Sequence, residues 1–250
     1  MILERKFSNL KVVLVEPNGP LNVGSVARLC ANFEVDELRI VSPKCEIFSS
    51  EAKKMAVKGL EYLDKCKIFK NIEQAIFDCD LVLASCGRIE TCKDSSFESP
   101  EDILKWISSF SQINNLAVLF GREDRGLTNS ELLLAQKIFN IPTSHNYPSL
   151  NLSHAVSIIL YELNKASNNK LKKKLKNFNL ASSNEIYESF LQIEEMLIRT
   201  GFLQKHTSLA KLTKFKKYIL RAKTTSHEIN ILRGIIRQIN WYINDPKKNK

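Results

Sequence analysis

The sequence predicts an α/β fold in which helices cover both faces of a parallel sheet, followed by a small basic α-helical extension. Short apolar runs typical of buried strands recur through residues 11–141, and segments with helical periodicity separate them. Strands that alternate with helices favour a parallel sheet, because each crossover places a helix on a face of the sheet. Near residue 164 the charge and the composition change together, which separates the extension from the α/β part.

Each predicted strand is a short apolar run bounded by polar or turn-forming residues. The runs occupy residues 11–17, 37–41, 81–85, 116–120 and 137–141. The helix expected after the first run carries Val23, Ala27, Cys30 and Ala31 along one face, as packing on a sheet requires. Ligands of such sheets bind beyond the carboxyl ends of the strands, so the loops that follow the runs are the candidate sites.

A domain boundary is expected within residues 164–184, which are rich in Lys, Asn and Ser and lack sustained apolar periodicity. We predict an α/β domain at residues 1–166, a basic linker at 167–184 and a basic helical extension at 185–250. The sequence contains no internal repeat.

Helical patterns in the extension cover about residues 185–200, 207–222 and 226–243. Two pairs have the spacing of a capping box, Ser182 with Glu185 and Thr225 with Glu228. Gly201 is a candidate end for the first of these helices.

The charge is distributed unevenly along the chain. Residues 1–163 hold 18 Lys and Arg against 21 Asp and Glu, a net charge of −3, and residues 164–250 hold 19 against 6, a net charge of +13; together they give the total of +10. Clustered cations favour nucleic acid or another acidic surface as a partner, because they displace counterions from phosphates. The alternative is a basic tail that is merely solvated.

The composition favours a cytosolic protein. No apolar run approaches the roughly 18 to 20 residues of a membrane span, and the first ten residues are too charged for a signal peptide. The six cysteines all lie in the first 92 residues without a C-x-x-C pair. We interpret them as buried or half-buried thiols rather than as a metal site, so no metal is expected.

The loop after the first run superficially resembles a phosphate-binding loop. Gly19 and Gly24 have the required spacing, but Ser25 stands where that motif needs a lysine to neutralise the terminal phosphates. A dinucleotide G-x-G-x-x-G motif and a hydrolase G-x-S-x-G motif are also absent. The sequence therefore argues against a nucleoside triphosphatase, a dinucleotide-binding fold and a serine hydrolase.

Two further strand-end loops are polar. After the run at 116–120, four charged residues stand between Gly121 and Gly126, and a helix is expected to begin near Thr128 or Asn129. The last run is followed by residues 141–156, where a helix is expected to begin near Asn151 and no Lys or Arg occurs. A helix start offers free N–H groups, so this stretch favours a ligand that is polar but not polyanionic.

Three motifs in order give a family resemblance. Asn22-x-Gly24-x-x-Ala27-Arg28, then residues 119–129 (LFGREDRGLTN), then Ile141-Pro142 with residues 149–153 (SLNLS) resemble the SpoU/TrmH-type branch of the SPOUT methyltransferases. The extension, with HEINILRGIIRQI near its end, looks like that of TrmJ-like tRNA 2′-O-methyltransferases.

The resemblance implies that the C-terminal part of the α/β domain forms a deep trefoil knot. It further implies S-adenosylmethionine as cofactor and a ribose 2′-hydroxyl of tRNA as the methyl acceptor, with the pyrimidine at position 32 of the anticodon loop as the expected target. A homodimer with the active site at its interface is also implied. Action on another tRNA position or on ribosomal RNA, and a non-catalytic RNA-binding relative, are the alternatives.

The resemblance also implies residues for the site. The expected cofactor-binding residues are Ser85, Cys86, Gly87, Gly121, Ile141, Pro148, Ser149 and Leu150. The expected catalytic residues are Arg28, Asn22, Glu123, Ser149 and Asn151. In the family the motif-one arginine, here Arg28, is the candidate activator of the ribose hydroxyl. Because a guanidinium keeps its proton in nearly every protein setting, we prefer an electrostatic role, with base catalysis left open.

Cations crowd the second helix expected in the extension, with aromatic residues between them. The candidate RNA-binding residues are Lys205, Lys211, Lys214, Lys217 and Arg221. Such residues contact phosphates and position an RNA without reading its sequence.

Overall fold

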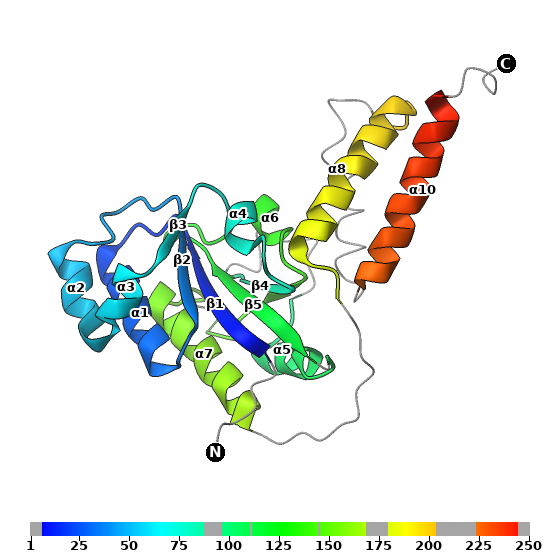
Figure 1. Cartoon of the computed structure of the whole chain (residues 1–250). Coiled ribbons are helices and arrows are strands. Elements are labelled where there is room, and N and C mark those ends of the chain that lie inside the picture. The colour runs from blue at the N-terminus through cyan, green and yellow to red at the C-terminus, as the bar shows by residue number, and fades with distance from the viewer. Residues whose placement is uncertain are drawn as a thin grey trace. The chain divides into compact units, whose positions relative to one another are not determined.

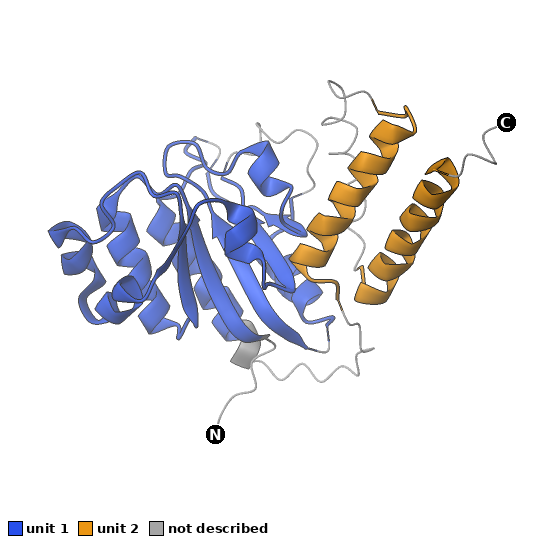
Figure 2. Ribbon diagram, turned by 45° about the horizontal axis from the view of Figure 1, so that its top comes forward, with its two compact units in different colours: residues 1–177 blue, residues 178–250 orange. Residues whose placement is uncertain are grey.

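The computed structural model describes residues 7–87, 97–110, 112–144, 146–168, 180–203 and 224–244. The chain divides into two compact units, unit 1 at residues 1–177 and unit 2 at 178–250 (Figure 2). The border falls within the predicted linker, whose extent stays a prediction. Among the described helices, none combines the length and the apolar character that crossing a membrane requires.

Unit 1 is built on a six-stranded sheet in the order β3-β2-β1-β5-β4-β6 (Figure 1). The strands are β1 (Phe7–Val15), β2 (Glu37–Val41), β3 (Lys67–Phe69), β4 (Leu81–Ser85), β5 (Ile113–Phe120) and β6 (Lys137–Phe139). Every pairing is parallel, which confirms the predicted sheet. Because all strands are parallel, their carboxyl ends lie at one edge of the sheet, and the loops beyond this edge are where such sheets bind ligands.

Helices cover both faces of the sheet, as predicted (Figure 1). They are α1 (Pro20–Asn32), α2 (Ser50–Ala56), the 3₁₀ helix η1 (Val57–Gly59), α3 (Leu60–Asp64), α4 (Ile72–Ile76), α5 (Pro100–Ile107), α6 (Asn129–Leu132) and α7 (Leu152–Asn168). On one face, α4 contacts β2 and β3, and its Ile72 and Ala75 share a core cluster with Val13 of β1 and Ala117 of β5. On the other face α1 and α7 contact each other, so the first and last helices of unit 1 are neighbours.

The glycines of α1 and η1 serve helix packing rather than phosphate binding. A Cβ on Gly24 would lie 2.1 Å from the carbonyl oxygen of Ala52 in α2, and a Cβ on Gly59 would lie 2.5 Å from that of Ala27 in α1. Real Cβ atoms do not come so close, so both positions need glycine for α2 and η1 to lie against α1. This contact explains Gly24 without a nucleotide.

A charged cluster lies within unit 1 on β1 and β2. The side chains of Lys11 and Arg39 are buried, and both bind Asp78, which follows α4. Arg39 makes two contacts with that carboxylate, at 2.7 and 3.0 Å. The hydrogen bond from Arg39, aided by Lys11 against the cost of burial, holds the pKa of Asp78 well below its usual value.

Replacing Asp78 by asparagine is expected to destabilise unit 1 by about 2 to 3 kcal/mol at pH 7. The change takes the carboxylate partner from buried Lys11 and one of two from buried Arg39, which keeps Glu37. The value lies at or below the lower end for broken buried pairs because Arg39 keeps this partner and Asp78 is half exposed. Since its folded-state pKa is lowered, the contribution is complete above the unfolded pKa of about 4 and is lost as the pH falls below it.

Urea unfolding of both proteins at pH 7 and near pH 3 measures this effect, with the exposed Asp64→Asn as the matched control. The deficit of Asp78→Asn should shrink at the lower pH. A deficit no larger than that of Asp64→Asn at pH 7 would contradict a stabilising role for the cluster.

The cysteines behave as predicted wherever the structure describes them. Cys30, Cys79 and Cys86 are buried, Cys45 and Cys66 are half-buried, and all five are reduced cysteines, while Cys92 lies outside the described residues. Burial raises the pKa of Cys66 to about 11 and that of Cys79 to about 12, so both thiols stay protonated and unreactive at neutral pH.

Unit 2 contains α8 (Ser183–Arg199) and α10 (Ser226–Asn244), which pack through Ile186, Phe190, Ile229 and Ile236. The predicted capping box at Ser182 and Glu185 is confirmed.

Two further features predicted for unit 2, a second capping box and a helix end, are also present. Thr225 and Glu228 exchange the two hydrogen bonds of a capping box. Gly201 follows Thr200, the C-cap of α8, and adopts φ +75°, which confirms the predicted end of that helix. The helix expected at 207–222 lies outside the described residues.

Candidate functional site

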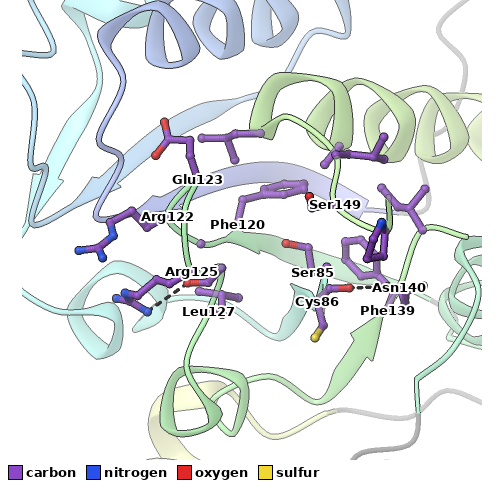
Figure 3. A pocket seen from close by; sticks show the side chains of 18 residues that line it. Ser85, Cys86, Phe120, Arg122, Glu123, Arg125, Leu127, Phe139, Asn140 and Ser149 are labelled. Atoms are coloured by element: carbon purple, nitrogen blue, oxygen red, sulfur yellow. Dashed lines mark hydrogen bonds between the residues drawn. The ribbon is translucent and has the colours of Figure 1, made fainter. Parts of the chain in front are cut away.

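A pocket opens beyond the carboxyl ends of β4, β5 and β6 (Figure 3). The structure brings together around it all eight residues expected to bind the cofactor: Ser85, Cys86, Gly87, Gly121, Ile141, Pro148, Ser149 and Leu150. Hydrogen bonds join two of the contributing loops, since Asn140 donates its side-chain N–H to the carbonyl of Cys86 at 2.7 Å, and the Cys86 N–H reaches the Phe139 carbonyl at 2.9 Å. The loops that follow three strands therefore form the pocket, and hydrogen bonds hold two of these loops together.

Sequence reasoning missed several lining residues, among them Phe120, Leu127, Phe139 and Asn140. Phe120 and Phe139 end their strands, and their rings meet edge to face with centroids 6.3 Å apart. Their position at two strand ends was a usable signal, because the carboxyl ends of parallel strands lie at the same edge of a sheet.

The loop after β5 is shaped by its two glycines. A Cβ on Gly121 would lie 2.2 Å from backbone atoms of Gly126 and Leu127, and Gly126 itself has φ +69°. The Gly126 N–H donates to the Arg122 carbonyl at 2.7 Å and closes the loop. A side chain at Gly121 would force this loop apart, so the backbone that borders the pocket depends on glycine there.

The cations that border the pocket already have anionic partners. Arg122 binds Asp124, and Arg125 binds Glu16 and Glu131. The hydrogen bond from Arg125, followed by that from Lys44, holds the pKa of Glu16 below its ordinary value. Glu123 adds a further negative charge to the lining. A polyphosphate would find no uncommitted cation among the described lining residues, whereas a cationic ligand would meet no net repulsion.

Glu123 ties the loop after β5 to the start of α1. Its carboxylate accepts hydrogen bonds from the N–H groups of Asn18 and Gly19 at 2.8 and 3.1 Å, and from the side-chain amide of Asn22 at 2.9 Å. An external carboxylate thus satisfies donors at the helix start, where the helix dipole favours a negative charge. Asn22 is the third residue of α1, whose cap is Gly19.

Asn151 connects the third motif to the first. It donates to the Asn22 side-chain oxygen at 2.9 Å and accepts from the N–H and the hydroxyl of Ser153, which makes it the cap of α7. Three of the expected catalytic residues, Asn22, Glu123 and Asn151, therefore form one chain of hydrogen bonds beside the pocket.

Two other expected catalytic residues stand apart from this chain. Ser149 lines the pocket and is exposed. Arg28 is also exposed, two turns along α1 from Asn22, and in the part of the chain that the structure describes it makes no ion pair and does not line the pocket.

The candidate RNA-binding cations Lys205, Lys211, Lys214, Lys217 and Arg221 lie outside the described residues. Within those residues, no three His, Cys, Asp or Glu side chains gather as a metal site would require.

Comparison with known families settles the class of this site. The model of the SpoU rRNA Methylase family matches residues 9–161, a span that includes all three motifs and the pocket. The chain belongs to this family. It is therefore an RNA methyltransferase, and S-adenosylmethionine is its methyl donor. A second model, the C-terminal domain of the tRNA methyltransferase TrmJ, matches residues 184–249.

Individual relatives resemble the chain over most of its length. It is 34% identical over 229 residues to the tRNA (cytidine-2'-O-)-methyltransferase TrmJ of Methanocaldococcus jannaschii, covering 88% of this chain and 94% of that protein. It is 31% identical to the tRNA (cytidine/uridine-2'-O-)-methyltransferase TrmJ of Sodalis glossinidius, covering 92% and 91%. The crystal structure of TrmJ from Z. mobilis is similar with a TM-score of 0.79 at 25% identity, covering 92% of this chain and 98% of that one.

Proposed function

We propose that this RNA methyltransferase methylates a ribose 2′-hydroxyl of tRNA, at the pyrimidine in position 32 of the anticodon loop. The observation that carries the proposal is the similarity along both units to relatives that are named tRNA 2'-O-methyltransferases. The match of residues 184–249 to the TrmJ C-terminal domain supports tRNA in particular, because it covers the part outside the methylase family match.

In this proposal the eight lining residues named above hold S-adenosylmethionine. The pocket suits this ligand, since backbone groups of the loops can meet an adenine edge while Ile141 and Leu150 flank its faces. The ligand carries a sulfonium cation and no phosphate. Arg122 and Arg125 are neutralised by Asp124 and Glu16, so they neither repel the sulfonium nor offer a free charge for a phosphate.

When bound, S-adenosylmethionine supplies a methyl group activated by the positive sulfur. The task left to the chain is to orient the ribose hydroxyl and to stabilise the negative charge that develops on its oxygen. We assign that charge stabilisation to Arg28. The chain of hydrogen bonds through Glu123, Asn22 and Asn151 fixes the loops around the ribose, and Ser149 lies at the mouth of the pocket.

The active site in this proposal is completed by a homodimer, in which each Arg28 serves the pocket of the other copy. Its exposure on α1, away from its own pocket, supports this arrangement. Exposed apolar side chains on α1 and α7, namely Leu21, Ile158 and Tyr161, offer a surface for the second copy.

The proposal includes the trefoil knot, a cytoplasmic location and docking of tRNA by residues 185–250 through Lys205, Lys211, Lys214, Lys217 and Arg221. The net charge of +13 after residue 163 supports the docking role.

A protein that ends at residue 166 should bind S-adenosylmethionine but lose most of its tRNA affinity, because most of the positive charge lies after that residue. Unchanged tRNA affinity in this shortened protein would contradict the docking role.

The test of the proposed function is methyl transfer to a tRNA transcript that carries a single 2′-deoxynucleotide. The unmodified transcript should accept one methyl group, and the 2′-deoxy substitution at position 32 should abolish the transfer because the nucleophile is gone. A 2′-deoxy substitution at a neighbouring nucleotide is the control. Transfer that persists without the 2′-hydroxyl of position 32 would exclude this target and leave another tRNA position; transfer to ribosomal RNA alone would favour the alternative substrate.

A further inference from the structure

Most of the described cations of unit 1 have a carboxylate partner, and all but one of those without an ion pair lie on α1 or on the segment packed against it. Among the described residues 8–87, 97–110, 112–144 and 146–165, ion pairs take up Lys11, Arg39, Lys44, Lys65, Lys67, Lys105, Arg122, Arg125, Lys137 and Lys165. Over the same ranges, the cations without an ion pair are Arg28, Lys53, Lys54, Lys58 and Lys70. All of these except Lys70 lie on α1, α2 or η1.

Close backbone contacts fix this group in place. Gly24 of α1 lies against Ala52, and Gly59 lies so near α1 that its Cβ would be 2.6 Å from the Cα of Arg28. Lys58 is therefore next to Arg28 in space as well as next to Gly59 in sequence. Val57 has φ +48°, a conformation that a β-branched residue rarely adopts, so surrounding contacts hold the segment.

The three lysines are exposed and give a local excess of positive charge within residues 1–163, whose net charge is −3. Lys53, Lys54 and Lys58 have a single acidic residue, Glu51, in residues 50–59, which gives 3 − 1 = +2 for that segment. Unpaired cations of one sign repel one another, and a polyanion that binds across them removes this repulsion and releases its own counterions.

We propose that Lys53, Lys54 and Lys58, called here the lysine strip, bind the phosphate backbone of the substrate RNA. The inference rests on the proposed function. Arg28 follows Asn22 by six residues, about 9 Å along α1 at 1.5 Å per residue, so this helix runs from the candidate site to the strip. Contacts of this kind position an RNA without reading its bases, and the strip would orient the ribose beside Arg28.

The experiment compares two triple variants with the same change in net charge. Lys53→Gln, Lys54→Gln and Lys58→Gln together remove the strip. Lys65→Gln, Lys70→Gln and Lys105→Gln together remove exposed cations elsewhere on unit 1. Affinity for a tRNA transcript is measured across a salt series, with S-adenosylmethionine affinity as the folding control.

The strip variant should bind tRNA about tenfold or more weakly at 0.1 M salt, and the magnitude of its log–log salt slope should fall by about 2 to 3. The control variant should stay close to the wild type, and S-adenosylmethionine affinity should be unchanged in both. Equal tRNA binding by the two variants would overturn the strip while the proposed function stands. A wild type that neither binds nor methylates tRNA would instead overturn the proposed function and the strip with it.

Discussion

Replacing Arg28 by alanine is expected to lower methyl transfer by about 100-fold or more, with little change in stability or in S-adenosylmethionine affinity. The loss follows because a charge that develops in the transition state would lose its partner. Stability should hold because the side chain is exposed and makes no ion pair with any described residue, and cofactor affinity should hold because Arg28 does not line its own pocket. Single-turnover methyl transfer to tRNA and calorimetry with the cofactor measure the two quantities.

The Arg28→Lys variant separates two versions of this role. If charge alone suffices, the lysine variant should retain partial activity, whereas a planar two-pronged contact would leave it nearly as poor as alanine. Lys70→Ala, which also removes an exposed cation without an ion pair in the described part of the chain, is the matched control. Wild-type turnover by Arg28→Ala would remove the residue from the mechanism.

Replacing Gly121 by alanine is expected to weaken S-adenosylmethionine binding by at least about tenfold and to abolish useful turnover. The added Cβ would lie 2.2 Å from the backbone of Gly126 and Leu127, so the loop that borders the pocket would have to move. Gly234→Ala is the control, since an added Cβ there meets nothing within 4 Å. A Gly121→Ala protein with normal affinity would show that this loop does not shape the binding site.

Mixing the two inactive variants tests the shared active site. A dimer of one Arg28→Ala chain and one Gly121→Ala chain joins an intact pocket on the first to an intact Arg28 on the second. If each arginine serves the pocket of the other copy, co-refolded variants should regain a fraction of the wild-type turnover. If Arg28 serves its own pocket, no such dimer contains a complete site and no activity should return.

The sheet could be predicted because most of its strands are apolar runs of five or more residues. Strand β3 could not be predicted, because Lys67–Phe69 is too short to show the alternation of apolar and polar residues typical of a strand, and its Ile68 is exposed. The helices α2, α3 and α4 each span between five and seven residues and depend on tertiary contacts, such as that between Gly24 and Ala52, which no local pattern contains.

The parts of the site could be predicted, but their contacts could not. Glu123 and Asn22 are 101 residues apart, and Asn151 and Asn22 are 129 apart, so their hydrogen bonds depend on the strand order. The four charges after β5 indicated a polar loop. Only the structure assigns the pairs, and Glu16 and Glu131, which bind Arg125, lie outside that run of charges.

The most direct test of the central claim, that S-adenosylmethionine occupies the pocket beyond β4, β5 and β6, is a calorimetric titration of S-adenosylmethionine, ATP and NAD into the wild type and into Gly121→Ala. We expect S-adenosylmethionine to bind the wild type and to bind Gly121→Ala poorly. ATP and NAD should not bind, because the arginines at the pocket are committed to Glu16, Asp124 and Glu131. Tight binding of NAD with none of S-adenosylmethionine would contradict the account and return the chain to a dinucleotide-binding function.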